Sequence, residues 1–372
     1  MEKDYYRAMR KKLFIGLSVV LGLIVVVAGL LWWYFLAGRV DVPANGDGEP
    51  VVALAQNLEI PWALDFLPDG GIVFTERPGR IRSISPDGVL GAEPLLNISE
   101  VAHQGEGGLL GIAVHPDFEA NGYIYIYFTY DRGNGLANKV VRLIYNGGNL
   151  VQDRVIIEGI PGAGNHNGGR LKFGPDGKLY ITTGDATNPS LAQDANSLAG
   201  KILRLNDDGT IPADNPFPGS PVYSYGHRNP QGLAWDADGR LWATEHGQSA
   251  TDELNLIMPG LNYGWPVIRG DETAAGMQSP VLHSGSFTWA PSGMAYLDGY
   301  LYFAGLRSQS IFRVDAGNAA GSITRLFESD FGRVRDVVAG PDGYLYILTS
   351  NRDGRAIPTG ADDQLIRVDL TG

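Results

Sequence analysis

The sequence predicts an all-β fold, a six-bladed β-propeller preceded by a single N-terminal transmembrane helix. The propeller is predicted by one hairpin pattern that recurs six times at intervals of roughly 50 residues, a spacing typical of propeller blades. It is also predicted by an abundance of glycine, 51 residues in 372, which suits a protein with many tight turns. We expect a basic flank and membrane anchor at 1–40, a linker at 41–50 and the propeller at 51–372.

The N-terminal segment has the charge and polarity pattern of a membrane span. Its apolar stretch, Leu13 to Gly38, exceeds the roughly 20 residues that a helix needs to cross a bilayer. The stretch ends in Trp32–Tyr34, residue types that favour the membrane interface. The preceding basic residues predict a cytoplasmic N-terminus and an extracytoplasmic propeller; they are Lys3, Arg7, Arg10, Lys11 and Lys12. A cleaved signal peptide ending near Leu36–Gly38 is the alternative.

Composition excludes several classes of site. The formal net charge of -12 argues against nucleic acid as a partner. The absence of cysteine excludes disulfides, thiolate metal sites and cysteine nucleophiles. Residues 41–50 are rich in Pro, Gly, Asn and Asp, which predicts a flexible tether between anchor and propeller.

Each repeat is an apolar strand, a turn containing glycine and a second apolar strand. The third copy, for example, is Leu171–Gly177 followed by Leu179–Ile181. A blade has about four strands, so the segments between copies, such as Val140 to Tyr145, supply the outer two. We expect Gln364–Val368 to pair with Val51–Ala55 and close the ring. An open sandwich with incidental turns is the alternative.

Polar residues gather at one end of the predicted hairpins. The start of the first strand and the end of the second share an edge, and the Pro-Asp-Gly turn lies at the opposite edge. If the first strand is the innermost, the residues at the first edge surround a central channel, where loops on a rigid scaffold build sites. These residues are Trp62, Glu76, Gln104, Glu106, Asn165–Arg170, Asp185, His227–Gln231, Glu245, His246, Thr288–Ser292, Arg307, Arg333, Arg335 and Asn351.

Histidine and arginine are the strongest functional candidates in this set. His166 lies between asparagines and glycines at the expected channel mouth, whereas a structural role is expected for the other histidines considered, His103, His115 and His283. Three arginines, Arg228, Arg333 and Arg335, converge on the channel. Unpaired charges are costly to desolvate, and arginine binds carboxylates in bidentate fashion. The cluster therefore predicts an anionic ligand.

Several motifs in order give the chain a family resemblance from about Val51 to Val368. They are Gly105–Gly111, His115–Phe118, Gly164–Arg170, Thr183–Asp185, Gly226–Gly232, Asp252–Asn255, Asn262–Pro266, Ala290–Ser292 and Arg333–Val337. This set resembles the soluble glucose dehydrogenase and aldose sugar dehydrogenase quinoproteins, the glucose/sorbosone dehydrogenase family. The resemblance implies a six-bladed propeller that binds pyrroloquinoline quinone (PQQ) and Ca²⁺ and oxidises the C1 hydroxyl of aldoses to lactones by hydride transfer to PQQ. Electrons would pass to an external quinone or cytochrome.

The resemblance also assigns roles. It makes His166 the general base, Asp185 its supporting carboxylate and Arg228 the group that stabilises negative charge on the quinone oxygen. The positions matching cofactor contacts are Gln104, Asn229, Thr288, Arg307, Arg333 and Arg335, with Arg307 in place of a family lysine. Two backbone carbonyls, at Gly247 and Gln248, match the Ca²⁺ ligands, although the family usually has proline where Gln248 stands. Missing insertions place the chain nearer the aldose branch, with a broad sugar range.

Two other functions are open at this stage. A metal-dependent propeller lactonase or hydrolase would use carboxylates and amides around a channel cation, with Glu76, Asn165, Asn229 and Asp185 as candidates, but the channel arginines would repel that cation. A non-catalytic sugar-binding propeller is the other alternative, and the presence of His166 and Arg228 argues against it. No Gly-rich strand-to-helix motif for a dinucleotide is found, so NAD is not expected as cofactor.

Overall fold

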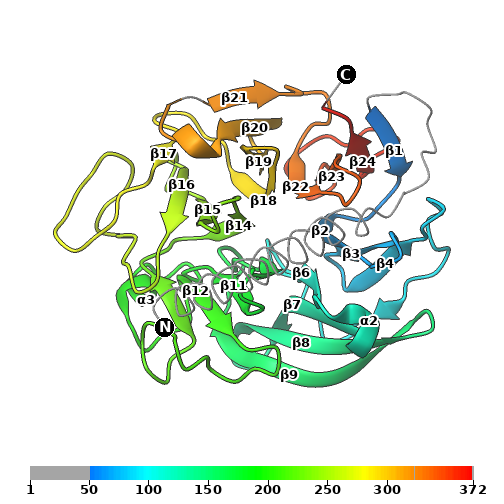
Figure 1. Cartoon of the computed structure of the whole chain (residues 1–372), viewed down its shortest axis with the longest axis horizontal. Helices are drawn as coiled ribbons and strands as arrows, with labels where there is room; N and C mark the ends of the chain where they lie inside the picture. Colours follow the sequence, from blue (N-terminus) through cyan, green and yellow to red (C-terminus); the bar gives the residue numbers. More distant parts are fainter. Residues whose placement is uncertain (1–50, 322, 371–372) are drawn as a thin grey trace, which may run out of the picture. The chain divides into compact units, whose positions relative to one another are not determined.

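Six similar sheets make up the regular structure. The computed structural model describes residues 51–321 and 323–370, and these form six four-stranded antiparallel sheets arranged around a common centre (Figure 1). The six-bladed propeller expected from the repeat is therefore confirmed. The predicted anchor and linker, residues 1–50, lie outside the described residues, and within those residues no helix has both the length and the apolar character to cross a membrane.

Strand position within each sheet follows the sequence repeat. The innermost strands are β2 (Pro61–Phe66), β6 (Leu109–Val114), β10 (Leu171–Phe173), β14 (Pro230–Trp235), β18 (Pro291–Leu297) and β22 (Val334–Ala339). The second strands are β3 (Ile72–Glu76), β7 (Tyr123–Asp131), β11 (Leu179–Thr183), β15 (Leu241–Glu245), β19 (Tyr300–Gly305) and β23 (Leu345–Thr349). Each pair is one predicted hairpin, so the first strand of the repeat is the innermost, as expected.

The remaining strands complete the blades. The third strands are β4 (Arg80–Ile84), β8 (Leu136–Asn146), β12 (Lys201–Leu205), β16 (Glu253–Ile257), β20 (Ser310–Asp315) and β24 (Leu365–Val368). The outermost are β5 (Leu96–Asn97), β9 (Asn149–Pro161), β13 (Val222–Tyr225), β17 (Leu282–His283), β21 (Ile323–Leu326) and β1 (Val51–Ala55). Short helical turns, α2 (Phe118–Asn121), α3 (Ser190–Gln193) and η1 (Ala316–Asn318), lie in the connections.

The first and last strands of the domain close the ring. Neighbouring sheets contact one another in chain order through their first or second strands, and the last innermost strand, β22, contacts the first, β2. Strand β1 pairs antiparallel with β24, with Val51 opposite Val368. The predicted closure is confirmed, and the sixth blade combines strands from both ends of the propeller.

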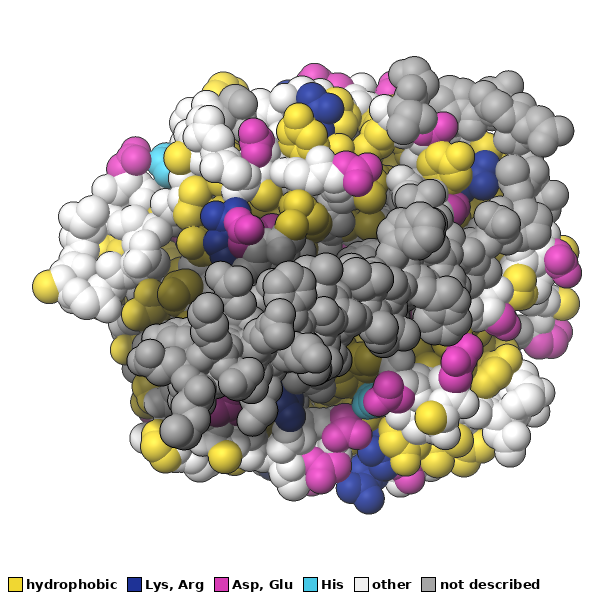
Figure 2. Space-filling view, viewed as in Figure 1, with side chains coloured by type: hydrophobic (Ala, Val, Ile, Leu, Met, Phe, Trp, Pro, Cys, Tyr) yellow, Lys and Arg dark blue, Asp and Glu magenta, His cyan; other side chains and the backbone are white. Residues whose placement is uncertain are grey.

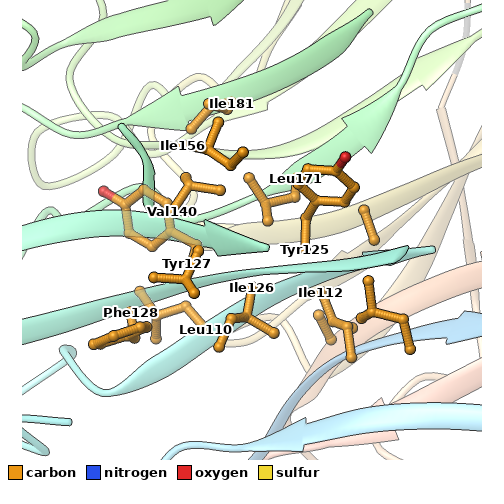
Figure 3. Close-up of a cluster of buried hydrophobic side chains, with 14 of the residues drawn as sticks. Leu110, Ile112, Tyr125, Ile126, Tyr127, Phe128, Val140, Ile156, Leu171 and Ile181 are labelled. Carbon is orange, nitrogen blue, oxygen red and sulfur yellow. The ribbon is translucent and has the colours of Figure 1, made fainter. Parts of the chain in front are cut away.

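Apolar side chains fill the space between blades. Figure 3 shows Leu110 and Val140 of the second blade with Leu171 and Ile181 of the third, all of them buried. Each fully buried aliphatic side chain contributes about 1.5–3 kcal/mol. Tyr127 is buried in the same cluster, and its hydroxyl donates a hydrogen bond of 2.8 Å to the backbone oxygen of Asn167. The core thereby fixes the loop that precedes β10.

The two ends of the ring differ in composition. We call the end where the innermost strands begin the site face, and the end where hairpins join them to the second strands the turn face. Turn-face glycines adopt the left-handed conformation that the predicted turns require, for example Gly177 (φ 70°) and Gly343 (φ 85°).

Between the two ends, Arg170 and Asp336 form an ion pair of 2.9 Å that joins the third and sixth blades. Over the described surface in Figure 2, acidic side chains recur with scattered lysines and arginines, in keeping with the net charge of -12.

Candidate active site

A histidine and a carboxylate meet on the site face. His166 lies in the loop before β10 and Asp185 in the loop after β11, and His166 Nδ1 is 2.7 Å from Asp185 Oδ1. The second carboxylate oxygen of Asp185 accepts a hydrogen bond of 2.9 Å from Trp265 Nε1. Because Asp185 is almost fully buried and acts as an acceptor, it favours the tautomer with a proton on Nδ1. The lone pair of His166 is then on Nε2, as a general base requires.

The His166 backbone is held in an unusual conformation. Its φ of 59° lies in the left-handed region that non-glycine residues rarely adopt. Its N–H donates to Glu106 Oε2 at 3.2 Å, and its carbonyl packs against Gly184 so closely that a Cβ there would lie 2.0 Å from the carbonyl oxygen. Strain of this kind persists only where surrounding contacts enforce it, and it is common at functional sites.

Arg228 lies beside this pair. Its carbonyl accepts the Asp185 N–H at 2.8 Å, its guanidinium carbon is 5.3 Å from the centroid of the Trp265 ring, and Nη1 donates to the His246 carbonyl at 3.2 Å. Burial lowers the pKa of Arg228, while nearby carboxylates, Asp185 first, oppose that effect. The Nε atom is buried and has no partner among the described residues.

Arg333 and Arg335 enter the same region from the sixth blade. Arg333 Nη2 is 2.8 Å from Asp353 Oδ2, whereas Arg335 Nη2 is 3.9 Å from it. Arg335 Nη1 donates to Gln231 Oε1 at 3.0 Å, but its Nε is buried without a partner in the described part of the chain. Burial lowers the pKa of Arg335 to about 9. The expectation of three unpaired arginines therefore needs correction, because Asp353 neutralises Arg333.

His246 adds a second imidazole. Its Nε2 atom is buried and has no partner among residues 51–321 and 323–370. Burial lowers the pKa of His246 to about 3, and the charge of Arg228 acts in the same direction. The ring is therefore neutral at physiological pH and can donate or accept a hydrogen bond. The Nε atoms of Arg77, Arg228 and Arg335 are likewise buried without a partner in the part of the chain that the structure describes.

The next residues form the candidate metal loop. Gly247 N–H donates to Asp252 Oδ1 at 2.9 Å, which fixes the loop. In the described structure, no hydrogen bond ends on the carbonyl oxygens of Gly247 or Gln248. Such oxygens are suitable ligands for Ca²⁺. Among the described residues, no cluster of three or more His, Asp or Glu side chains could hold a metal.

The other predicted cofactor contacts lie on the same face and differ in how deeply they are buried. Asn229 is buried and its Oδ1 accepts the Gly168 N–H at 3.0 Å, which ties the His166 loop to the fourth blade. Thr288 donates to the Ser249 carbonyl at 3.1 Å, and Arg307 is exposed beside it in a cavity of about 480 Å³. Gln104 is exposed and forms hydrogen bonds through its backbone.

Several residues of this centre were not predicted as site residues. Trp265 and Asp252 lie within motifs quoted for the family resemblance, but nothing in the sequence indicates that they contact Asp185 and Gly247. Asp353 lies in the loop after β23, two residues beyond Asn351, so its loop was identified and the residue was not. Arg77 directly follows Glu76 at the end of β3; its Nη2 donates to the carbonyls of Gly105 and Gly107.

Comparison with known proteins identifies related chains. The family model for Glucose / Sorbosone dehydrogenase matches residues 58–359. Aldose sugar dehydrogenase YliI of Escherichia coli is 34% identical over 345 residues, which cover 82% of this chain and 91% of that protein. Quinoprotein glucose dehydrogenase B of Acinetobacter calcoaceticus is 38% identical over 256 residues, 60% of this chain and 53% of that protein. The solved PQQ-bound aldose sugar dehydrogenase of Streptomyces coelicolor matches with a TM-score of 0.81 and 41% identity, covering 88% of this chain and 99% of that one.

Proposed function

The chain belongs to the glucose/sorbosone dehydrogenase family, and we propose that it is a quinoprotein that oxidises the C1 hydroxyl of aldose sugars to lactones with PQQ as cofactor. One observation carries the proposal: buried nitrogens of Arg228, Arg335 and His246 have no partner among the described residues, on the face that also holds the His166–Asp185 pair. Unsatisfied buried donors are costly, and an anionic ligand removes that cost.

The residues present fit a polycarboxylate. Arginine side chains bind carboxylates through charge-assisted hydrogen bonds, and Arg228 and Arg335 would hold PQQ, with Asn229, Thr288, Arg307, Arg333 and Gln104 as further contacts. Bound PQQ supplies the oxidant, a quinone that accepts two electrons from the sugar. A neutral His246 adds a hydrogen-bonding group without adding charge.

His166 is the base that removes the sugar hydroxyl proton. An alcohol is a weak acid, and an imidazole is the side chain best suited to accept its proton near neutral pH. Asp185 accepts a hydrogen bond from the Nδ1–H group and stabilises the imidazolium that forms when Nε2 takes the proton. Trp265 fixes the carboxylate through Oδ2, so it is a positioning residue for the base.

Arg228 stabilises negative charge that develops beside the base. Its guanidinium is held by the ring of Trp265 and the carbonyl of His246, and its backbone N–H donates to the Glu245 carboxylate. A cation fixed before the reaction does not have to reorganise when charge appears, which is the basis of electrostatic catalysis.

Calcium is assigned to the loop at Gly247 and Gln248. The support is the pair of carbonyl oxygens that accept no hydrogen bond in the described structure. Gln248 leaves the loop less rigid than proline would, so we expect weaker Ca²⁺ binding than in a variant that carries Gln248→Pro.

Reconstitution tests the proposed function. Purified protein with PQQ and Ca²⁺ should oxidise several aldoses with an artificial electron acceptor, and NAD should not replace PQQ. Absorbance titration should show saturable PQQ binding. Activity that depended on NAD, or lactone hydrolysis with Ca²⁺ alone, would replace this function with another.

The N-terminal segment is proposed to anchor the enzyme with its catalytic domain on the extracytoplasmic side. The support is the sequence: basic residues precede an apolar stretch longer than 20 residues. Protease added to intact spheroplasts should release the domain, and full protection would contradict this topology. A chain that begins at Asp41 should remain soluble and folded, because the six sheets bury their own core.

A further inference from the structure

A cavity lies beside the active site on the fifth blade. It has a volume of about 480 Å³, and its wall includes Phe287, Thr288, Trp289, Arg307, Phe312 and Arg325. Thr288 and Arg307, both expected to contact PQQ, belong to its wall. The cavity therefore adjoins the proposed cofactor site and extends from it toward the outer strands β20 and β21.

Hydrogen bonds tie the cavity wall to the active site. Asp252 Oδ2 accepts the N–H groups of Trp289 and Ala290, at 2.6 and 2.9 Å, and Asp252 Oδ1 accepts that of Gly247. Arg333 Nη1 donates to the carbonyl of Leu306, the residue before Arg307, at 3.3 Å. The wall is thus held by Asp252, which also fixes the candidate metal loop, and by Arg333, itself a predicted cofactor contact.

The wall combines aromatic surface with positive charge. The rings of Trp289 and Phe312 lie 5.3 Å apart and are buried, whereas Phe287 is 76% exposed at the rim. The Arg325 guanidinium carbon is 5.9 Å from the Phe312 centroid, and Arg307 is exposed on the same wall. Small-molecule pockets are typically lined by apolar and aromatic side chains with a few charged or polar groups, as this wall is. Arg325 Nη1 lies 2.8 Å from Glu328 Oε1 in an exposed ion pair, whereas the Arg307 side chain has no ion pair among the described residues. In a protein with a net charge of -12, this positive charge favours an anionic ligand.

We propose that this cavity binds the external electron acceptor, a flat anionic quinone or quinone-imine that lies against Phe287 and Trp289 with its charge near Arg307 and Arg325. The inference rests on the proposed sugar oxidation. Oxidation of the C1 hydroxyl to a lactone releases two electrons and two protons, and reduction of the quinone to its hydroquinone consumes the same number. A site adjoining the cofactor keeps the distance for electron transfer short.

Binding to the PQQ-loaded protein without sugar tests the inference independently of turnover. The probe is dichlorophenolindophenol, an anionic quinone-imine, titrated by isothermal calorimetry. An exposed charge contributes up to about 1 kcal/mol, so Arg325→Gln should weaken dye binding about fivefold. Phe287→Ala should also weaken it. The matched control is Arg313→Gln, which removes the same charge from β20, where the guanidinium lies over the Tyr300 ring outside the cavity wall.

The outcomes separate the two proposals. Uncharged benzoquinone should bind equally to the wild type and Arg325→Gln, because it lacks the charge that Arg325 recognises. If PQQ loads normally but the dye binds equally to wild type, Arg325→Gln and Phe287→Ala, the acceptor site is refuted and the sugar oxidation is not. If PQQ fails to bind to the wild type, the proposed function itself is wrong, and the acceptor site falls with it.

Discussion

The two faces of the propeller are built from the same hairpin and use their polar residues in opposite ways. On the turn face, aspartates satisfy their own blade: Asp236 Oδ2 accepts Trp242 Nε1 and Arg240 Nε, both at 2.7 Å, and Asp342 Oδ2 accepts the Tyr346 hydroxyl at 2.8 Å. On the site face, nitrogens of Arg228 and Arg335 are buried without partners among the described residues. One face uses its polar groups for stability, and the other leaves them available for a ligand.

The two faces also differ in backbone conformation, because strained residues are more frequent on the site face. Several non-glycine residues with positive φ lie in loops that precede innermost strands or follow second strands, namely Ile60, His166, Ala186, Thr187, Ser249, Thr251 and Ala290. In hairpin turns such as those at Gly177 and Gly343 the positive φ falls on glycine, although Asp298 of the β18–β19 turn also has a positive φ, of 47°. Backbone strain and unsatisfied donors therefore gather where function is proposed. The repeat tolerates them because polar groups on the opposite face are hydrogen-bonded and the core is well packed.

The largest expected effect on turnover comes from substituting a histidine of the site face, with a histidine of the turn face as the control. His166→Gln should lower turnover by about 10²–10⁴-fold, because general base catalysis is lost, while PQQ binding remains. The control, His115→Gln on the turn face, should leave turnover unchanged, because His115 Nδ1 accepts the Asp117 N–H within its own turn. Rapid-mixing absorbance of quinone reduction measures both. Near wild-type reduction by His166→Gln would refute the base assignment.

Arginine exchange should give the next largest effect. Arg228→Gln should lower turnover by about 10²–10³-fold, because a preorganised charge is removed, and it should also weaken PQQ binding. Arg240→Gln makes the same change on the turn face, where Arg240 pairs with Asp236 at 2.7 Å. Steady-state kinetics and PQQ titration compare them. Equal losses in the two variants would mean that the site face has no special role.

A buried carboxylate of the fourth blade should make the free energy of unfolding fall as pH rises. Burial and the charge of Glu245, its cross-strand neighbour, raise the pKa of Glu253 to about 8 from the usual 4.5. Between pH 4.5 and 8 the folded state holds a proton that the unfolded state has released, so the free energy of unfolding falls as pH rises, by an amount on the order of a few kcal/mol. Glu253→Gln should remove this fall. Denaturant unfolding at pH 5 and 8.5, in metal-free buffer, measures it, and parallel pH profiles for the two proteins would exclude the explanation.

The smallest effect is expected on the turn face. Burial acts to raise the pKa of Asp236, but hydrogen bonds from Trp242 and Arg240 outweigh it, so the pKa is lowered. Asp236→Asn should cost about 1 kcal/mol at pH 7. That cost should disappear as pH falls below the usual aspartate range, because the carboxylate is then protonated in the wild type as well. Thermal unfolding measures this, and a loss of turnover in the folded variant would contradict the division between faces.

The fold and the site loops could be predicted from the sequence because both follow from the repeat. Six in-phase hairpins define the blades, and the end of each strand places His166, Asp185 and Arg228 at one edge. The side chains that contact those three residues could not be predicted in this way. The Trp265 indole contacts Asp185 across 80 positions of sequence, so that contact depends on how two blades pack. Asp353 meets Arg333 at the edge of a single hairpin, through a loop whose conformation the repeat does not define. Partner choice is a tertiary property that local pattern does not encode.

A crystal structure of the protein reconstituted with PQQ and Ca²⁺ would test the central claim most directly, because that claim concerns location. The account predicts electron density for PQQ on the site face, in hydrogen-bonding contact with Arg228 and Arg335 and within reach of a sugar bound at His166. Density for PQQ on the turn face, or a site face that stays empty at saturating PQQ, would contradict it.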